Sequence, residues 1–407
     1  MVSKKTKLNL LLLFIFAGVF LFVKNASPEI SESAPTKTNP ESPIRIGYFH
    51  GGRTALLMRA YSNKEFDAAG LPVEFYATKL RSDKYELIPK SITRFNQESG
   101  GEFYAGKARG TELTDAIMAG KMDLAMVGES SFLESMYAGK PIVAIAELGH
   151  DVKGHSGHVM LMRDNIEIKS PGDFLGKILV SRRAGPGDGA FMRAFLDKCG
   201  VDIKKDILQL SNTSLPKNLM EKRKLPKNKI IVIDDMYEDV MRKGLENGII
   251  DGGYFHLMFL EGPRFVGLHL LQPLHAWANP ELSHALLVCH KDFLRKNQNR
   301  LIKLIEVYIK RIKYEHSLSY EERTNPPDKT KGFKMACNIS GLNYPQYDLI
   351  PTTSVELLYD VQKLLIRYST FRKKKLKIEN FVDNSLVLKA AENLGITEKD
   401  DYWQSEY

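Results

Sequence analysis

The alternation of apolar and polar positions is clearest between Gly110 and Leu148, where one pattern occurs twice. Each copy has a polar residue able to cap a helix, a short amphipathic segment, a glycine and an apolar run. In the first copy, Thr111 and Gly120 bound the amphipathic segment, and Asp123–Val127 is the apolar run. This pattern predicts a helix, a left-handed glycine stop and a buried strand.

The second copy follows directly. Ser131 and Glu134 have the S-x-x-E spacing of a capping box, Gly139 ends the segment, and Pro141–Ala146 is the next apolar run. Strands that alternate with helices of this length predict a mostly parallel sheet, and such sheets bind ligands at the carboxyl ends of their strands. The loop that joins the two copies, Gly128–Ser131, is therefore a candidate ligand contact.

The same stretch resembles a known family. A helix ending in AIMAGKMDLAMVG, a small polar loop and a helix ending in YAGKPIVAIA are similar to the nitrate/sulfonate/taurine-type substrate-binding proteins of ABC importers, which are relatives of the thiamine-pyrimidine-precursor binders. The resemblance covers roughly Ile44 to the low 300s. It implies an α/β, two-lobed periplasmic-binding-protein fold of type II. Each lobe would be a mostly parallel sheet flanked by helices, with a hinged ligand cleft between the lobes.

The N-terminus has the pattern of an export signal. Lys4, Lys5 and Lys7 precede an apolar run, Leu8–Val23, interrupted only by Asn9. The run is shorter than the roughly 20 residues of a spanning helix, and no clear A-x-A site follows, so cleavage and a retained anchor both stay open. The following segment is rich in Ser, Pro, Thr and Glu and is typical of a tether. We expect an exported protein, in the periplasm or on the outer face of the cytoplasmic membrane.

These patterns and the resemblance together predict the organisation of the chain. The expected parts are a signal sequence or membrane anchor at 1–24, a linker at 25–43, the first part of lobe 1 at 44–155, lobe 2 at 156–294, and a return to lobe 1 with C-terminal helices at 295–407. Between 77 and 109 the chain departs from the family pattern by a long insertion, for which a surface excursion is favoured over a lid.

Composition and charge limit the classes of partner that the protein is expected to bind. The 407 residues are 43% hydrophobic, enough for one large or two medium cores, and the net charge is +9. The basic residues are spread along the chain without a nucleic-acid-binding module, so we expect no nucleic-acid partner. The three cysteines, Cys199, Cys289 and Cys337, are far apart and lack metal-ligand spacing. We interpret them as buried free thiols.

Three loops supply the other candidate contacts. His50-Gly-Gly-Arg-Thr54 follows the first strand and opens a helix, so unpaired N–H groups and a positive dipole end favour an anion there. A plain tight turn with a Thr cap is the alternative, and the resemblance favours binding. In the connector 149–158, the resemblance places His155 and Ser156 toward the cleft. Its histidines match no zinc signature, so we interpret them as incidental and predict no metal site.

The second lobe offers the loop Arg182–Gly189. Its glycines match neither the dinucleotide nor the Walker pattern, but a guanidinium beside a helix N-terminus suits carboxylate, sulfonate or phosphonate oxygens. Two solvated arginines are the alternative. A G-x-x-D-G pattern before Tyr254 mirrors the first lobe and places Tyr254 and His256 at a strand's carboxyl end, facing the cleft. A core residue with a satisfied hydroxyl is the alternative for Tyr254. The predicted ligand-binding residues are His50, Arg53, Thr54, Thr111, Gly128, Glu129, Ser130, Ser131, His155, Ser156, Arg182, Arg183, Gly187, Asp188, Tyr254 and His256.

No catalytic motif is apparent: the chain has no G-x-S-x-G, no H-E-x-x-H and no cysteine with an evident histidine partner. We therefore predict a monomeric extracytoplasmic solute-binding protein, without cofactor or catalytic residues, that captures a small polar or anionic organic ligand and presents it to an ABC permease. The first alternative is a membrane-tethered sensory or interaction module on the same fold. A pyrimidine-synthase-like enzyme is the second, and the absence of that family's cysteine cluster argues against it.

Overall fold

The computed structural model divides the chain into two compact units, Met1–Pro40 and Glu41–Tyr407. It describes residues 42–48, 52–78, 85–88, 110–150, 158–182, 186–211, 225–256, 268–270, 284–319, 322, 346–369 and 375–397. The predicted export signal at 1–24 lies outside these ranges and stays a prediction. Within the described ranges, none of the helices combines the length and the apolar character needed to cross a bilayer.

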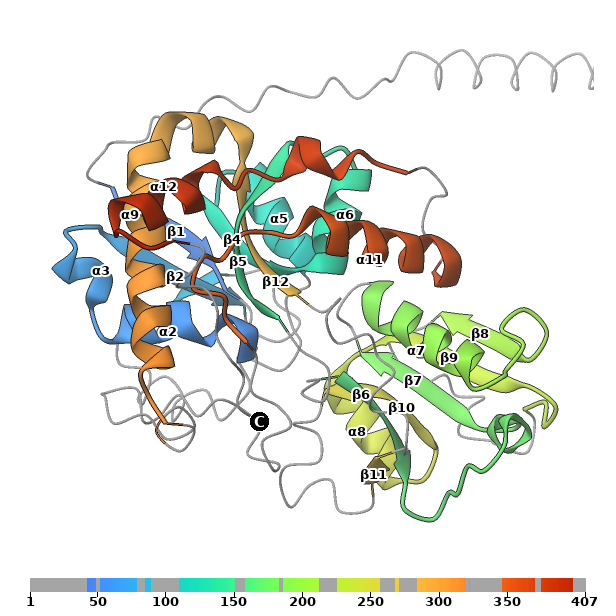
Figure 1. Cartoon of the computed structure of the whole chain (residues 1–407). Helices are drawn as coiled ribbons and strands as arrows, with labels where there is room; N and C mark the ends of the chain where they lie inside the picture. The colour runs from blue at the N-terminus through green and yellow to red at the C-terminus, as the bar shows by residue number, and fades with distance from the viewer. Residues whose placement is uncertain are drawn as a thin grey trace, which may run out of the picture. The chain divides into compact units, whose positions relative to one another are not determined.

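The first sheet has the strand order β3-β2-β1-β4-β12-β5 (Figure 1). The strands are β1 Ile44–Gly47, β2 Val73–Thr78, β3 Tyr85–Leu87, β4 Leu124–Gly128, β5 Ile142–His150 and β12 His284–His290. β1 is parallel to β2 and β4, whereas β12 is antiparallel to both β4 and β5. The carboxyl ends of β1, β4 and β5 therefore lie at one edge of the sheet, together with the beginning of β12. We call this edge the carboxyl edge of the first sheet.

The second sheet has the order β11-β6-β10-β7-β9-β8. Its strands are β6 His158–Arg163, β7 Ile178–Arg182, β8 Ile207–Ser211, β9 Ile230–Met236, β10 Gly252–His256 and β11 Leu268–Leu270. β7 is parallel to β9 and β10, and β9 is parallel to β8. β6 runs antiparallel to its two neighbours, β10 and β11.

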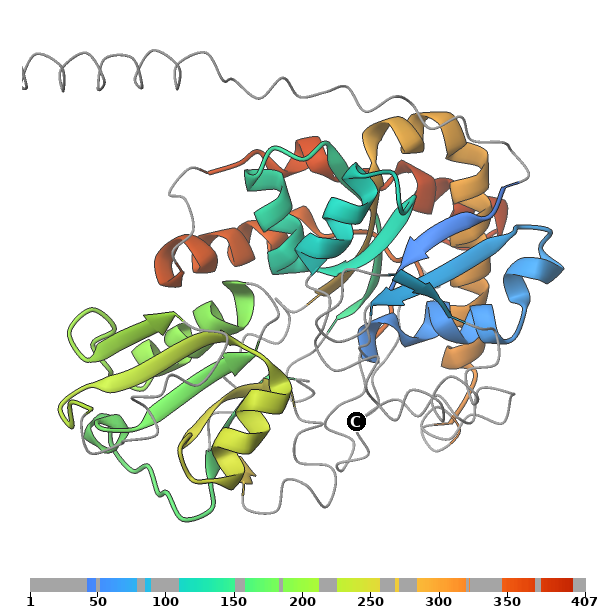
Figure 2. The ribbon, with the colours of Figure 1, turned by 180° about the vertical axis from the view of Figure 1, so that it is seen from behind.

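Helices cover both faces of the first sheet (Figures 1 and 2). The described helices are α2 Ala55–Ser62, α3 Glu65–Ala68, α5 Gly110–Met118, α6 Glu129–Tyr137, α7 Pro186–Lys198, α8 Glu238–Glu246, α9 Lys291–His316, α11 Val355–Tyr368 and α12 Ser385–Asn393, with 3-10 turns η1 Gly52–Thr54, η2 Pro171–Phe174 and η8 Ile378–Phe381.

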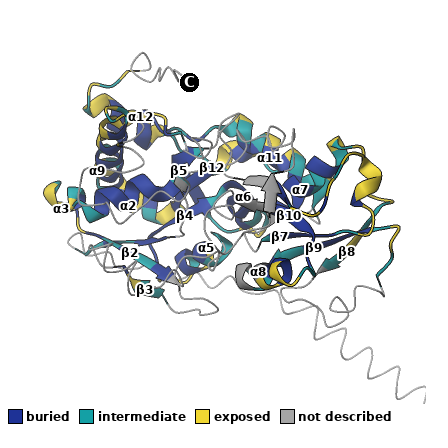
Figure 3. Ribbon diagram, turned by 90° about the horizontal axis from the view of Figure 1, so that it is seen from below, coloured by how far each residue is buried: buried dark blue, intermediate teal, exposed yellow. Residues whose placement is uncertain are grey.

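Side chains along β4 point alternately to the two faces of the first sheet, and each face packs against its own layer of helices. Leu124 and Met126 pack in a core that contains the buried faces of α2, α9 and α12. Ala125 and Val127 point to the opposite face, into a core shared with α5 and α6. Because successive strand residues face opposite sides, a strand apolar at every position is buried on both. Figure 3 shows this central layer as buried, with exposed residues on the outer helix faces.

The repeated helix-and-strand unit is confirmed, with shifts at its helix starts. Gly120 and Gly139 end their helices with φ of +66° and +78°, as predicted. The predicted capping box at Ser131 is wrong: α6 begins at Glu129, with Gly128 as N-cap and without a side-chain cap bond. Likewise α5 begins at Gly110, so Thr111 lies within its first turn instead of capping it. Each helix starts earlier than its first cap-type residue.

Two further boundaries are decided by the structure. α2 and α3 are separate helices, because Lys64 has a left-handed φ of +61° between them. β12 was expected within lobe 2, which was predicted to extend to residue 294, but it pairs with β4 and β5 in the first sheet. An apolar strand has the same sequence pattern in either sheet, so only its partners decide where it lies.

Candidate functional site

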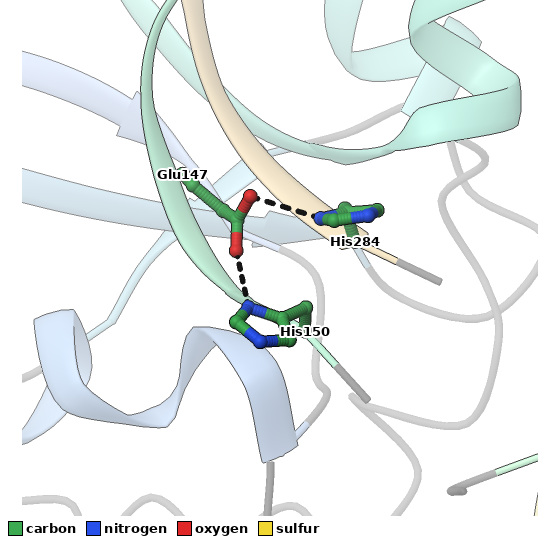
Figure 4. Close-up of side chains that lie close together, drawn as sticks. All are labelled: Glu147, His150 and His284. Carbon is green, nitrogen blue, oxygen red and sulfur yellow. Dashed lines mark hydrogen bonds and ion pairs between the residues drawn. The ribbon is translucent and has the colours of Figure 1, made fainter. Parts of the chain in front are cut away.

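Three polar side chains meet at the carboxyl edge of the first sheet, on the adjacent strands β5 and β12 (Figure 4). Glu147 and His150 come from the end of β5, and His284 is the first residue of β12. His284 stands opposite His150 in the strand pairing. Their side chains therefore share one face of the sheet.

A β-bulge puts Glu147 on that face as well. Residues three apart in a regular strand point to opposite faces. Here Ala285 pairs with Gly149 while Leu286 pairs with Glu147, so β5 has one extra residue at this point. Gly149 has φ of +133°, which disfavours other residues, and a Cβ there would lie 2.9 Å from the ring of Tyr347. The bulge and its glycine bring Glu147 and His150 together.

The Glu147 carboxylate bridges the two imidazoles. Its Oε1 lies 2.6 Å from Nδ1 of His150, and its Oε2 lies 2.9 Å from Nδ1 of His284. An ionised carboxylate can only accept, so each Nδ1 donates. Burial alone would raise the pKa of Glu147, but the charge of His284 and the hydrogen bonds from both histidines lower that pKa to about 2. Glu147 is therefore a buried anion between two imidazoles.

A second buried carboxylate, Glu129, lies next to this cluster. It is the first residue of α6, directly after β4, and its Oε2 accepts the backbone N–H of His284 at 3.1 Å. Nη1 of Arg53, from η1, lies 3.9 Å from the same oxygen. Burial raises the pKa of Glu129 above its ordinary value, although Arg53 and His284 act in the opposite direction. An ion pair this long does not offset the loss of solvation.

The first turn of α7, the helix that follows β7 of the second sheet, approaches Glu129. A Cβ on Gly187 would lie 2.5 Å from Oγ of Ser130 and 3.7 Å from Oε1 of Glu129. Asp188 is near enough that its charge contributes to the raised pKa of Glu129. Nε of Arg182 donates to Asp188 Oδ2 at 2.5 Å. The structure thus brings the predicted loops at Arg53, Glu129 and Gly187 together.

The sequence model of the family described as NMT1/THI5 like matches residues 104–316, more than half of the 407 residues. The chain belongs to the NMT1/THI5-like family. This confirms the resemblance to the nitrate/sulfonate/taurine-type proteins. A search of curated protein sequences finds no match to the chain.

Solved structures share the fold of this NMT1/THI5-like protein. A periplasmic sulfonate-binding protein SsuA from Methylobacillus flagellatus KT is 15% identical with a TM-score of 0.54, covering 89% of this chain and 97% of that chain. The periplasmic aliphatic sulphonate binding protein SsuA from Escherichia coli is 16% identical, with a TM-score of 0.50 and coverage of 84% and 92%. The desulfurization enzyme DSZB is 10% identical, with a TM-score of 0.50 and coverage of 86% and 99%. The predicted two-lobed α/β fold is confirmed.

Four other residues that were predicted to bind ligand contact the protein's own side chains or backbone, or cap a helix. Tyr254 is 2% exposed and stacks on Phe191, with ring centroids 6.1 Å apart, in the core of this NMT1/THI5-like protein. The carbonyl of Thr111 accepts from Nζ of Lys140 at 3.2 Å. Ser131 lies against α5, where a Cβ on Gly110 would be 2.6 Å from the Ser131 Cβ. Thr54 is the N-cap residue of α2 and is buried, without a side-chain cap bond.

Several predictions fall outside the described residues. These are His50, His155, Ser156 and Arg183, and also the side chain of His256, whose backbone lies in β10. Their assignment to the ligand site stays a prediction. Of the cysteines, Cys289 is buried and free as expected, Cys199 is free and partly buried, and Cys337 is not described.

Sequence reasoning missed Glu147 and His284 and dismissed His150 as incidental. The pair Glu147-x-x-His150 was a usable local signal, but a regular strand would separate the two side chains. His284 is far away in the chain and carries no local motif. Only the pairing of β5 with β12 reveals the three as a group.

Proposed function

We propose that this protein binds a small polar or anionic organic solute outside the cytoplasm and presents it to an ABC permease. The observation that carries the proposal is the convergence of Arg53 and Glu129, at the first sheet, with Gly187 in the first turn of α7, from the second lobe. Ligands of open α/β sheets bind at the carboxyl ends of strands. The fold is shared with periplasmic sulfonate-binding proteins, which supports transport as the role.

The charges at this edge favour a solute with two kinds of polar group. Arg53 offers a planar guanidinium that suits a sulfonate, phosphonate or carboxylate. Glu129 is a buried carboxyl with a raised pKa, and its oxygens can accept hydrogen bonds from a solute amine or hydroxyl. An amino-sulfonate or a polar heterocycle has both features. Contacts from both lobes would stabilise a closed state that the permease recognises.

An enzyme remains the second candidate, because DSZB shares the fold. The two described cysteines argue against thiolate chemistry. Burial raises the pKa of Cys199 to about 11, and it raises the pKa of Cys289 further. Both thiols are therefore protonated at neutral pH and poor nucleophiles. A tethered sensory module is the third candidate, and it would keep the solute site but not require a permease.

The test is a solute screen with the purified protein. A panel of amino-sulfonates, alkanesulfonates, phosphonates and pyrimidines is examined by thermal shift, and hits are followed by calorimetry and small-angle scattering. A true solute at a hundredfold excess over Kd should stabilise the fold by about 2.7 kcal/mol and reduce the radius of gyration. Turnover of a bound compound would favour the enzyme instead.

Two variants connect binding to the site. Arg53→Gln and Glu129→Gln should each lower the affinity for the identified solute by roughly tenfold or more. A tenfold change of affinity corresponds to about 1.4 kcal/mol of binding free energy. Lys169→Gln is the matched control, because the Lys169 side chain is 73% exposed on the second lobe. Unaltered affinity in both site variants would place the solute elsewhere.

A further inference from the structure

The geometry points to a metal site that the sequence did not predict: we propose that Glu147, His150 and His284 bind one divalent transition-metal ion, with Zn²⁺ as the best-matched member of the class. The three residues offer ligand atoms that all lie within 4.8 Å of one another. They lie at the carboxyl edge of the first sheet, on two hydrogen-bonded strands (Figure 4).

The donor set selects the metal class. Two imidazole nitrogens and one carboxylate are ligands of Zn²⁺, Fe²⁺ and Co²⁺, and sites of this composition keep a coordination position open. Ca²⁺ and Mg²⁺ prefer oxygen ligands alone. With no thiolate in the group, a soft ion such as Cu⁺ is disfavoured.

The present contacts are close to those of a bound ion. Nδ1 of each histidine is 2.6 or 2.9 Å from a Glu147 oxygen. Ligands about 2.1 Å from a tetrahedral ion lie roughly 3.4 Å apart, so each histidine nitrogen needs to move less than an ångström away from its Glu147 oxygen. The ion replaces two N–H···O hydrogen bonds. A neutral ring then carries its proton on Nε2, whereas an imidazolium releases one proton to solvent.

An independent observation concerns the other nitrogen of His284. The His284 side chain is 3% exposed, and its Nε2 is buried without a hydrogen-bond partner in the part of the chain that the structure describes. Buried polar atoms nearly always have partners, so this nitrogen calls for a group beyond the described residues, such as a water that accepts its proton once the ion is on Nδ1. The backbone of His284 is also anchored, because its N–H donates to Glu129.

The experiment uses the untagged full-length chain, purified in mild detergent and stripped with a chelator. Co²⁺ is titrated and followed by its visible absorption, and Zn²⁺ is then added in competition. We expect one equivalent of Co²⁺ per chain with ligand-field bands, displaced by one equivalent of Zn²⁺. Glu147→Gln and His284→Gln should each lower the affinity for Zn²⁺ by more than roughly 100-fold. The loss of a residue that only supports a metal ligand already lowers metal affinity by about 10- to 100-fold.

His290→Gln is the matched control. It lies on the same strand, β12, and its Nδ1 accepts the backbone N–H of Asp292 at 3.0 Å, away from the cluster. Its Zn²⁺ affinity should equal that of the wild type.

His150→Gln is a second site variant that is less prone to misfold, because the His150 side chain is 15% exposed and contributes less to the core. Circular dichroism of each metal-free variant establishes that it is folded.

The outcomes are separate from those of the solute screen, because no solute is present. Absence of stoichiometric Co²⁺ and Zn²⁺ binding overturns the metal site and leaves the solute proposal standing. The same conclusion follows if folded His150→Gln and His284→Gln bind Zn²⁺ with the affinity of the wild type. A Zn²⁺-dependent rise in Tm for the wild type and His290→Gln, absent in His150→Gln, supports it.

Discussion

The carboxyl edges of the two sheets use charged residues in different ways. At the second sheet, carboxylates and guanidinium groups pair with each other: Arg182 with Asp188, and Arg193 with Asp234 at 2.7 Å. Asp234 also accepts from Ser181 at 2.9 Å. At the first sheet, the buried carboxylate Glu147 contacts two imidazoles, and Nε2 of His284 has no hydrogen-bond partner among the described residues.

This difference indicates which of the two edges can contact a ligand without first breaking an internal ion pair. Arg–carboxylate pairs satisfy their charges internally, so a ligand must displace a partner to use them. The first edge contains two nearby buried carboxylates whose pKa values move in opposite directions: Glu147 down and Glu129 up. Pairs of groups with divergent pKa values cluster at functional sites. The following predictions test this contrast, from the largest expected effect to the smallest.

Removal of the Glu147 carboxylate should have the largest effect. Glu147→Ala leaves two imidazoles without their shared acceptor and should lower the free energy of unfolding by about 3 to 5 kcal/mol. Urea unfolding followed by circular dichroism measures this. Glu167→Gln is the control, since the Glu167 side chain is 75% exposed, and a change within about 0.5 kcal/mol is expected. A similarly small effect for Glu147→Ala would mean that the cluster contributes little.

Acid should remove the contribution of Glu147. Its folded pKa of about 2 lies below the ordinary 4.5, so its stabilisation is complete above pH 4.5 and is lost as the pH falls toward 2. We expect the wild type to lose as much as about 3 kcal/mol relative to Glu147→Gln over this window. Urea midpoints at several pH values measure the difference. A constant difference would contradict the lowered pKa.

The second edge should behave as an internal pair. Arg182→Gln and Asp188→Asn should each cost about 1 to 2 kcal/mol of stability, and the double variant should cost less than their sum because both remove one interaction. A double-mutant cycle by urea unfolding gives the coupling. Additive effects would show that Arg182 and Asp188 do not stabilise each other and would contradict the internal pair.

The smallest effect is expected at Glu129, with the opposite sign. Its folded pKa is raised, so the wild type is stabilised below pH 4.5 and loses that stability as the pH rises through the folded pKa. Glu129→Gln cannot ionise and should become the more stable form toward neutral pH. Thermal melts of both proteins at pH 4 and pH 7.5 test the change of sign. Parallel melting curves would argue that Arg53 fully compensates the charge.

Local features were readable from the sequence because their causes are local. Positive φ at Gly120 and Gly139 follows from the absence of a side chain, and both end helices as predicted. The starts of α11 and α12 likewise follow residues of the cap type, Ser354 and Asn384. Helix starts were less certain, because α6 follows β4 with only Gly128 as its N-cap.

By itself, the sequence determined the alternation of strands and helices, the burial of β4 and β5, and a polar segment at Glu129 after β4. Tertiary structure decided the site. The bulge at Gly149 turns Glu147 and His150 to one face, and the pairing of β12 with β5 sets His284 opposite His150. Periodicity reports only contacts within a few residues along the chain. Strand partners are chosen by the packing of the whole core, so a cluster built across two strands has no signature in either one.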